Sequence, residues 1–233
     1  MAEEEEEGGD TNEFTWSGKL VDYLPIGIGK ASFPNGDTYE GPYEDGKRNG
    51  KGKYTYKNGA IYDGQYVQNH KTGYGVMTYP DKGIYEGAWF KDQKHGEGKF
   101  TYPNKDIYKG EWKDNLRHGV GTYFFAISMS QFMGDWYQGN FISGQWQFRN
   151  GDIYEGGFAK NRPEGAGKFM FAANKTTLYG TFADTKWLSG RWKHTPVAVL
   201  ATGNAARKRP SMTFDPAMVR ANQPSFVIPM RFC

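Results

Sequence analysis

Aromatic residues and glycines fall at every second position in short stretches of this chain. In the first clear example, Tyr39, Gly41 and Tyr43 alternate with Glu40 and Pro42. Successive side chains of a β-strand point to opposite faces of the sheet, so the two tyrosines and the glycine share one face. The stretch therefore predicts a β-strand with an aromatic, glycine-bearing face.

A second alternating run completes a hairpin. After a polar stretch over residues 44–50, Gly52, Tyr54 and Tyr56 again share one face. Two such runs separated by a turn segment are typical of an antiparallel β-hairpin. Glycines at this density would cost about 1 kcal/mol each inside a helix, which favours strands. A Lys-Asn-Gly turn at residues 57–59 leads into the next unit.

The hairpin phrase repeats with a period of 23 residues, and its opening tyrosines are Tyr39, Tyr62, Tyr85 and Tyr108. The glycines that define the opening phrase are Gly41, Gly64, Gly87, Gly110, Gly134 and Gly156. The aromatics that close it are Tyr43, Tyr66, Trp89, Trp112 and Trp136. Self-similarity at this period predicts a repeat architecture in which each unit stacks on its neighbours.

Altered units flank the four regular ones. A first unit around Trp16 has a more apolar loop, which is typical of a capping repeat. A later unit opens at Phe132 and keeps only Gly144 of its glycine pair, and the repeat stops after His194. We therefore predict an array of about seven to eight hairpin units over residues 14–192.

The predicted fold is all-β: an elongated single-layer antiparallel sheet of stacked β-hairpins with extended termini. Two strands per unit advance by about 10 Å, since neighbouring strands lie about 4.8 Å apart. Such a layer has no thick core, so its rings must pack on one another and over glycines. We expect each glycine to leave a gap for a ring of a neighbouring strand, and the aromatic face to remain partly open.

Composition and charge divide the chain into three parts. Aromatics make up 17% of the 233 residues and glycines number 32, which suits a sheet of rings and glycines better than an aliphatic core. Residues 1–13 predict a disordered acidic arm, and residues 193–233 predict a basic extended tail. The one cysteine, Cys233, excludes an internal disulfide framework. The acidic start and the short aliphatic runs predict a soluble, cytoplasmic protein.

The phrase Y-E-G-x-W, followed by H-G-x-G and by Y-P-x-G, resembles the MORN repeat. Within that family the chain is similar to the MORN-repeat proteins of the radial spoke head in motile cilia and flagella, over residues 34–41, 46–48 and 160–169. The resemblance implies a cytoskeletal scaffold of the axoneme. Its implied partners are other radial spoke head proteins, a paralogous MORN-repeat chain or a second copy of itself. A short basic tail stands where such proteins can carry an acidic stretch.

Catalytic and ligand-binding signals are weak. The glycine pairs, such as Gly50 with Gly52, lack the third glycine of a dinucleotide motif and precede strands rather than helices. His95 and His118 occupy one loop position in successive units, which favours loop decoration over metal binding. The basic run at residues 207–209 is shorter than nucleic-acid patches usually are. The sequence predicts no catalysis, no cofactor, no metal and no nucleic-acid partner.

Three hypotheses for binding are open. The first is a protein–protein scaffold, because Tyr and Trp are frequent hot spots of interfaces. Its anchors would be the aromatic strip Tyr43, Tyr66, Trp89, Trp112 and Trp136. The alternative for each ring is that it only packs within the sheet.

The second hypothesis is phosphoinositide binding at a membrane surface through recurring loop bases, although acidic neighbours keep the local net charge small. Those bases are Lys47, Arg48, Lys71, Lys94 and Arg117. The third is a targeting module that acts in trans on an enzyme.

Overall fold

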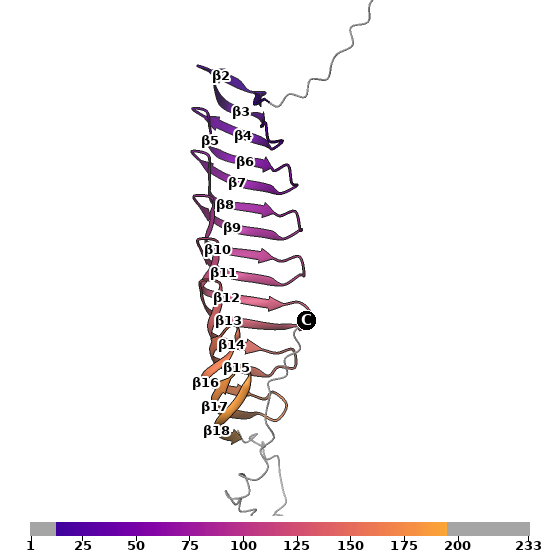
Figure 1. Ribbon diagram of the computed structural model, residues 1–233, viewed down its shortest axis with the longest axis vertical. Coiled ribbons are helices and arrows are strands. Elements are labelled where there is room, and N and C mark those ends of the chain that lie inside the picture. Colours follow the sequence, from indigo (N-terminus) through magenta and orange to yellow (C-terminus); the bar gives the residue numbers. More distant parts are fainter. Residues whose placement is uncertain (1–12, 195–233) are drawn as a thin grey trace, which may run out of the picture. The chain divides into compact units, whose positions relative to one another are not determined.

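The computed structural model describes residues 13–194, which form strands and turns without a helix. The strands belong to an open, 18-stranded antiparallel sheet, which confirms the predicted all-β fold of stacked hairpins (Figure 1). Their bounds are β1 (Thr15–Trp16), β2 (Lys19–Val21), β3 (Leu24–Ser32), β4 (Thr38–Glu44), β5 (Lys47–Arg48), β6 (Gly50–Thr55), β7 (Ile61–Val67), β8 (His70–Thr78), β9 (Ile84–Phe90), β10 (Gln93–Thr101), β11 (Ile107–Lys113), β12 (Leu116–Phe125), β13 (Ser130–Tyr137), β14 (Asn140–Gln147), β15 (Ile153–Ala159), β16 (Arg162–Met170), β17 (Thr176–Ala183) and β18 (Lys186–His194).

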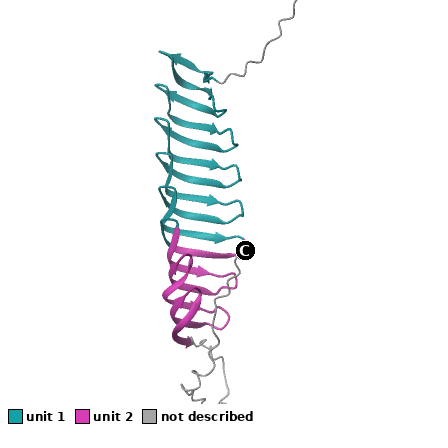
Figure 2. Cartoon of the chain, in the orientation of Figure 1, with its two compact units in different colours: residues 1–126, 135–139 teal, residues 127–134, 140–233 magenta. Residues whose placement is uncertain are grey.

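The described chain divides into two compact units, shown in different colours in Figure 2. Unit 1 comprises the residues up to Ala126 together with Asp135–Gly139, and unit 2 comprises Ile127–Gly134 and the residues from Asn140 onward. Within unit 1, each strand lies beside its neighbours in sequence, so this unit by itself is an elongated single layer of hairpins (Figure 1).

Two predicted parts of the chain lie almost wholly outside the described residues. The acidic arm, residues 1–13, is described only at Glu13, and the basic tail, residues 193–233, only at Lys193 and the backbone of His194. Both parts stay predictions.

The hairpin turns are tighter than the sequence predicted. A loop was expected over residues 44–50, but the turn is confined to Asp45 and Gly46, and β5 starts directly after it. Both residues have positive φ, 48° and 74°, as a two-residue type I′ hairpin turn requires. Gln68 and Asn69 repeat the same angles in the next hairpin. Glutamine is not a typical turn residue, so the position of this two-residue turn could not be predicted from the sequence.

The first glycine of each pair introduces an irregularity into the second strand of its hairpin. Gly73, Gly96 and Gly119 have φ values of 58°, 70° and 56°. The register between β7 and β8 shifts beside Gly73, between Gly64 and Gln65. An irregular register of this kind is a β-bulge, which bends the strand and which glycine accommodates in the left-handed region. The first glycine of each pair therefore provides the positive φ that the bulge requires.

The second glycine of each pair and the glycine of each opening phrase form a row that crosses the strands of unit 1. Paired residues in adjacent strands bring the members of the row together, as for Gly64 with Gly75 and Gly75 with Gly87. In order along the sheet the row is Gly29, Gly41, Gly52, Gly64, Gly75, Gly87, Gly98, Gly110 and Gly121. A strip of bare backbone therefore runs along the aromatic face of this unit.

The opening tyrosine of each regular unit lies over this glycine row. A Cβ added at Gly75 would stand 2.6 Å from a ring carbon of Tyr62, and one added at Gly64 would stand 2.6 Å from another. The Tyr62 hydroxyl donates a hydrogen bond to the carbonyl of Gln65 at 3.2 Å. Equivalent bonds hold Tyr39, Tyr85 and Tyr108.

The expected arrangement, with each glycine gap filled by a ring of a neighbouring strand, is therefore wrong in one respect. Tyr62 and Gly64 belong to the same strand, so this glycine is covered by a ring of its own strand. The Tyr62 hydroxyl holds the ring there through its bond to a carbonyl three residues further along. The ring then extends over the glycine of the next strand as well.

The closing aromatic of each unit joins two successive units. Trp112 meets the ring of Tyr108, in its own strand, at 5.1 Å and 90°, and the ring of Tyr85, one repeat earlier, at 5.3 Å and 85°. Trp89 makes the same two contacts with Tyr85 and Tyr62. Edge-to-face geometry at these distances is the favoured arrangement of aromatic pairs. The rings of unit 1 therefore form a continuous ladder of T-shaped contacts.

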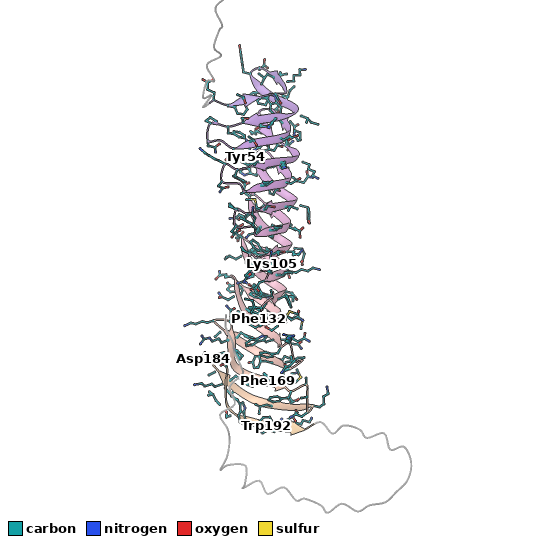
Figure 3. All side chains as sticks on the ribbon, turned by 90° about the vertical axis from the view of Figure 1, so that its right-hand side faces the viewer. Tyr54, Lys105, Phe132, Phe169, Asp184 and Trp192 are labelled. Atoms are coloured by element: carbon teal, nitrogen blue, oxygen red, sulfur yellow. The ribbon has the colours of Figure 1, made fainter. Side chains whose placement is uncertain are left out.

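Unit 2 keeps the glycine row but changes the rings around it. Its row is Gly134, Gly144, Gly156, Gly167, Gly180 and Gly190. Phe132 lies flat against Phe141, with centroids 4.7 Å apart and planes at 4° (Phe132 is labelled in Figure 3). In the last hairpin Leu178, which is fully buried, takes the position of the opening tyrosine.

A methyl group on the glycine row should loosen the sheet of unit 1. We expect Gly75→Ala to lower the free energy of unfolding by about 1–3 kcal/mol, because its Cβ overlaps with the Tyr62 ring. Urea unfolding monitored by tryptophan fluorescence measures the change.

Gly59→Asn is the matched control, since Gly59 has a φ of 87° that Asn tolerates and no neighbour within 4 Å of an added Cβ. Its effect should stay below about 1 kcal/mol, because Asn enters the left-handed region at a lower cost than other non-glycine residues. Equal losses in the two variants would contradict the role of the ring contact.

Candidate functional site

The five aromatics of the predicted strip lie in the core. Their exposed fractions range from 2% for Tyr66 to 6% for Tyr43. The indole N–H of Trp89 donates to the carbonyl of Gly75 at 3.2 Å, and Trp112 and Trp136 make equivalent bonds. The expectation of a partly open face does not hold for these rings, because the ladder itself covers them. Their contacts with a partner stay a prediction.

A different set of rings is half exposed. In unit 1 it consists of Phe33, Tyr56, Tyr79, Tyr102 and Phe125, which follow one another at intervals of 23 residues. We call it the outer ring row. Each ring stands where the second strand of a hairpin leads into the next unit.

The outer ring row rests against rings of the second strands of the hairpins. Tyr102 lies 4.4 Å from Phe100 and 5.6 Å from Tyr123, measured between ring centroids. Tyr79 lies 5.6 Å from Phe100. The sequence placed Tyr56 on the glycine face without separating it from the core. The signal that was missed is the unbroken 23-residue spacing from Phe33 onward.

Four cationic side chains form a second row on the same face. We call Arg48, Lys71, Lys94 and Arg117 the cation row. Each is the second residue after a hairpin turn and stands opposite the closing aromatic of its hairpin, as Lys94 does opposite Trp89. The spacing is again 23 residues, so unit 1 presents one cation per repeat. All four side chains are half-buried.

The charged head of each cation lies over aromatic rings. The guanidinium carbon of Arg117 is 4.5 Å from the centroid of Trp136 and 5.2 Å from that of Tyr123. The Lys94 ammonium is 4.7 Å from the Trp112 centroid and 5.1 Å from that of Phe100. Such cation–π contacts contribute about 0.5–1 kcal/mol at exposed sites and more where water is excluded.

The cation row also touches the outer ring row. The Lys71 ammonium donates a hydrogen bond to the Tyr56 hydroxyl at 3.2 Å, and the Lys94 ammonium lies 6.0 Å from the Tyr79 centroid. The two rows therefore form one surface in which half-buried rings and positive charges alternate. We call it the ring–cation surface.

Lys94 carries its charge in an unfavourable environment. Burial lowers its pKa from 10.5 to about 8. The ion pairs within 4.0 Å among residues 13–194 involve none of the four cations of the row. A desolvated cation without a carboxylate partner costs stability, and such groups are frequent at functional sites.

Two carboxylates lie near the first half of the cation row. Burial would raise the pKa of Asp37, but hydrogen bonds from the Lys57 N–H and the Tyr54 hydroxyl, with the charge of Arg48, lower it overall. Burial would likewise raise the pKa of Asp92, and the Lys71 N–H, His70 and the Lys71 charge together lower it. Neither carboxylate contributes to the shift of Lys94.

The stacked turns hold the cation row in place. The side-chain oxygen of Asn69 accepts a hydrogen bond from the backbone N–H of Arg48 at 2.9 Å, and that of Asn115 does the same for Lys94. The backbone N–H of Asn115 in turn donates to the carbonyl of Lys94 at 3.1 Å. Because each turn is bonded to the turn before it, the spacing of the cations is set by the backbone.

Unit 2 has apolar residues at the corresponding positions. Pro163 stands opposite Phe158, and Trp187 stands opposite Phe182. The Phe141 N–H donates to the side-chain oxygen of Asn161, as that of Arg48 donates to Asn69. The cation row therefore ends with unit 1.

The loop bases proposed for membrane binding have two different environments. Arg48, Lys71, Lys94 and Arg117 make up the cation row, whereas Lys47 is exposed and donates to the Gln68 side chain at 2.7 Å. Four of the five predicted bases thus lie over rings rather than in free loops.

The opposite face of unit 1 is different in character. Charged side chains there form ion pairs across strands, as Lys99 does with Glu86 at 3.1 Å. Exposed apolar residues are scattered among them, including Tyr74, which is 64% exposed. Isolated exposed apolar residues are normal on protein surfaces.

The histidines are not gathered into a site. His95 lies beside the Phe90 ring at 5.8 Å, and His118 lies beside the Tyr137 ring at 5.5 Å. Residues 13–194 contain no cluster of three or more His, Cys, Asp or Glu side chains that could hold a metal ion. The same residues contain no helix able to cross a membrane.

The fold and the ring–cation surface define a repeat protein built from stacked ring-and-glycine hairpins. The family model for the MORN repeat matches five stretches, residues 39–61, 62–84, 85–107, 108–128 and 154–175. These stretches are MORN repeats, and four of them follow one another through unit 1. The hairpins around Trp16, Phe132 and Leu178 lie outside the matched stretches, although they continue the same sheet pattern within their units.

No curated protein matches the chain significantly. Among solved structures, the TCP10 domain of Danio rerio CPAP is similar with a TM-score of 0.43 and 13% identity, over 76% of this chain and 82% of that one. The TCP domain of Drosophila melanogaster SAS-4, solved in complex with a proline-rich motif of Ana2, is similar with a TM-score of 0.36 and 18% identity, over 62% and 72% of the two chains.

Replacing the desolvated cation should stabilise the protein. We expect Lys94→Met to raise the midpoint of thermal unfolding near pH 7 by about 2–4 °C, which corresponds to about 1 kcal/mol. Methionine keeps the packing of the stem over Trp112 and Phe100 and removes the buried charge.

The pH dependence provides the control. From about pH 8 to pH 10, Lys94 is neutral in the folded protein but charged in the unfolded chain, so the unfolded chain binds more protons and stability rises with pH. Above pH 10 stability falls, because burial raises the pKa of Tyr39 to about 12 and the unfolded tyrosines ionise first. Lys94→Met should lack the rise between pH 8 and pH 10. A rise that persists in the variant would contradict this account.

Proposed function

We propose that this protein is a non-catalytic scaffold that holds other polypeptides through the ring–cation surface of unit 1. The observation that carries the proposal is the repetition of one half-buried ring and one cation in each successive hairpin, at a spacing set by the backbone. Tyr and Arg are over-represented among the residues that dominate binding energy at interfaces. MORN repeats, present in five stretches, suggest a module for protein interaction or membrane binding.

The repeating surface suits an elongated partner better than a small ligand. Each repeat offers the same chemistry, so contacts add along the sheet, as in other repeat proteins with extended binding surfaces. A partner that spans several repeats gains from many weak contacts at once.

We further propose that the scaffold is a component of the radial spoke head in the axoneme of motile cilia or flagella. Residues 34–41, 46–48 and 160–169 support this assignment through their similarity to MORN-repeat proteins of that assembly. The partners would then be other radial spoke head proteins, a paralogous MORN-repeat chain or a second copy of this chain.

Binding to phosphoinositides at a membrane surface is the second candidate. It is favoured by one observation, the absence of ion pairs at the cation row among residues 13–194. Basic residues near an anionic surface contribute about 1 kcal/mol each. Flotation with liposomes that contain phosphoinositides separates the two candidates, because a protein scaffold stays in solution.

The experiment for the scaffold uses paired tyrosine variants. We expect Tyr79→Ser with Tyr102→Ser to reduce capture of radial spoke head proteins from ciliated-cell extract at least tenfold, as measured by quantitative mass spectrometry. Both rings belong to the half-exposed outer ring row, so their loss removes binding area.

Tyr74→Ser is the matched control, because Tyr74 is exposed on the opposite face of the same repeat. Capture should be unchanged in this variant. Thermal unfolding of each variant separates lost binding from lost folding. If a folded Tyr79→Ser/Tyr102→Ser protein captures radial spoke head proteins as well as the unaltered protein does, the proposal is wrong.

A further inference from the structure

The distance between successive cations restricts the conformation of whatever binds them. Each repeat contributes two strands, and strands lie about 4.8 Å apart, so equivalent atoms recur about every 9.6 Å along unit 1. The stacked turns keep this interval from Arg48 to Arg117. A bound polypeptide can place one carboxylate on each cation only if its own repeat has the same length.

A polyproline II helix has that repeat. It has three residues per turn and rises about 3.1 Å per residue, so every third side chain points the same way at intervals of about 9.3 Å. The mismatch with the sheet is about 0.3 Å per repeat.

Other regular conformations fit less well. Side chains on one face of a β-strand recur about every 6.7 Å, and no small multiple of that length equals 9.6 Å. Seven residues of an α-helix rise about 10.5 Å, which is about 0.9 Å too long for each repeat. Over three repeats this error exceeds the tolerance of a charge-assisted hydrogen bond.

The surface between the cations suits the same conformation. Rows of half-exposed aromatic rings are the surfaces on which proline rings dock in known modes of polyproline recognition. In unit 1 the outer ring row runs beside the cation row, and Lys71 touches Tyr56 directly. A chain with two prolines and one acidic residue per turn would place its prolines on the rings and its carboxylates on the cations.

On these grounds we propose that the ring–cation surface binds an extended polypeptide in the polyproline II conformation, with an acidic residue at every third position. This proposal rests on the proposed scaffold function and names its partner by chemistry. Charge complementarity selects acidic over basic segments, and the missing carboxylate beside Lys94 is supplied by the bound chain. Lys71, Lys94 and Arg117 would each receive one carboxylate.

The test is titration of the full chain with a fluorescein-labelled (Glu-Pro-Pro)4 peptide, followed by fluorescence anisotropy. We expect saturable binding that weakens as the salt concentration rises. (Lys-Pro-Pro)4 has the opposite charge, (Glu-Gly-Gly)4 has the same charge spacing without the preformed helix, and (Glu-Pro-Pro-Pro)3 has the wrong period. Each should bind at least tenfold more weakly.

Variants place the site on the proposed surface. Lys71→Gln with Lys94→Gln should raise the dissociation constant at least tenfold. Lys53→Gln with Lys109→Gln removes two exposed lysines from the opposite face and leaves the ion pairs intact, so its effect should be less than twofold. Lys94→Met should weaken binding while raising the unfolding temperature. That combination distinguishes a binding residue from a structural one.

Three binding results would overturn the proposal, and so would a complete absence of peptide binding. The first is equal binding of the four peptides, and the second is an equal loss in the two lysine pairs. The third is an affinity that increases at least tenfold when residues 1–12 are removed, because the acidic arm of the chain itself would then be the occupant. If none of the peptides binds while native partners are still captured through Tyr79 and Tyr102, the scaffold function stands and this inference fails.

Discussion

The contact on which the fold depends is that between a tyrosine ring and bare backbone. Tyr62 can lie over Gly64 and Gly75 only because neither residue has a Cβ, and its hydroxyl stays satisfied by the carbonyl of Gln65. The same contact recurs in each regular hairpin. A ring held in this orientation offers its face and edges to Trp89 of the next repeat. A local contact thereby becomes the interface between successive units.

A single layer must also cover its aromatic face without a second layer of strands or helices. In unit 1 the long stems of Arg and Lys do this, because they lie along the rings and bring their charged heads to the surface. In unit 2 Pro163 and Trp187 occupy the equivalent positions. The two units therefore have the same backbone pattern but different chemistry. Among residues 13–194, only unit 1 combines a periodic charge with periodic half-buried rings.

Much of the fold could be predicted from the sequence. The alternation of Tyr39, Gly41 and Tyr43 and its 23-residue period determine strands, hairpins and stacking, because side-chain direction in a strand depends only on position. The same reasoning did not find the two-residue turn at Gln68 and Asn69. Glutamine rarely adopts a positive φ, so its presence does not indicate such a turn. For the candidate site, the sequence did not separate covered rings from half-buried ones. The aromatics chosen as partner anchors are buried, whereas the half-buried rings of the outer ring row stand later in each repeat, at the end of the second strand.

The sequence by itself determined which residues share a face and how often they recur, since both follow from local geometry. Only the tertiary structure decided which aromatics are covered. Burial depends on the ring that the adjacent hairpin supplies, and Trp112 covers Tyr85 from a whole repeat away. It also decided that Lys94 lies over rings rather than in a solvated loop, because the turn after β9 (Ile84–Phe90) is bonded to its neighbours. The spacing of residues is a property of the sequence, whereas the exposure of each side chain depends on the neighbouring hairpins.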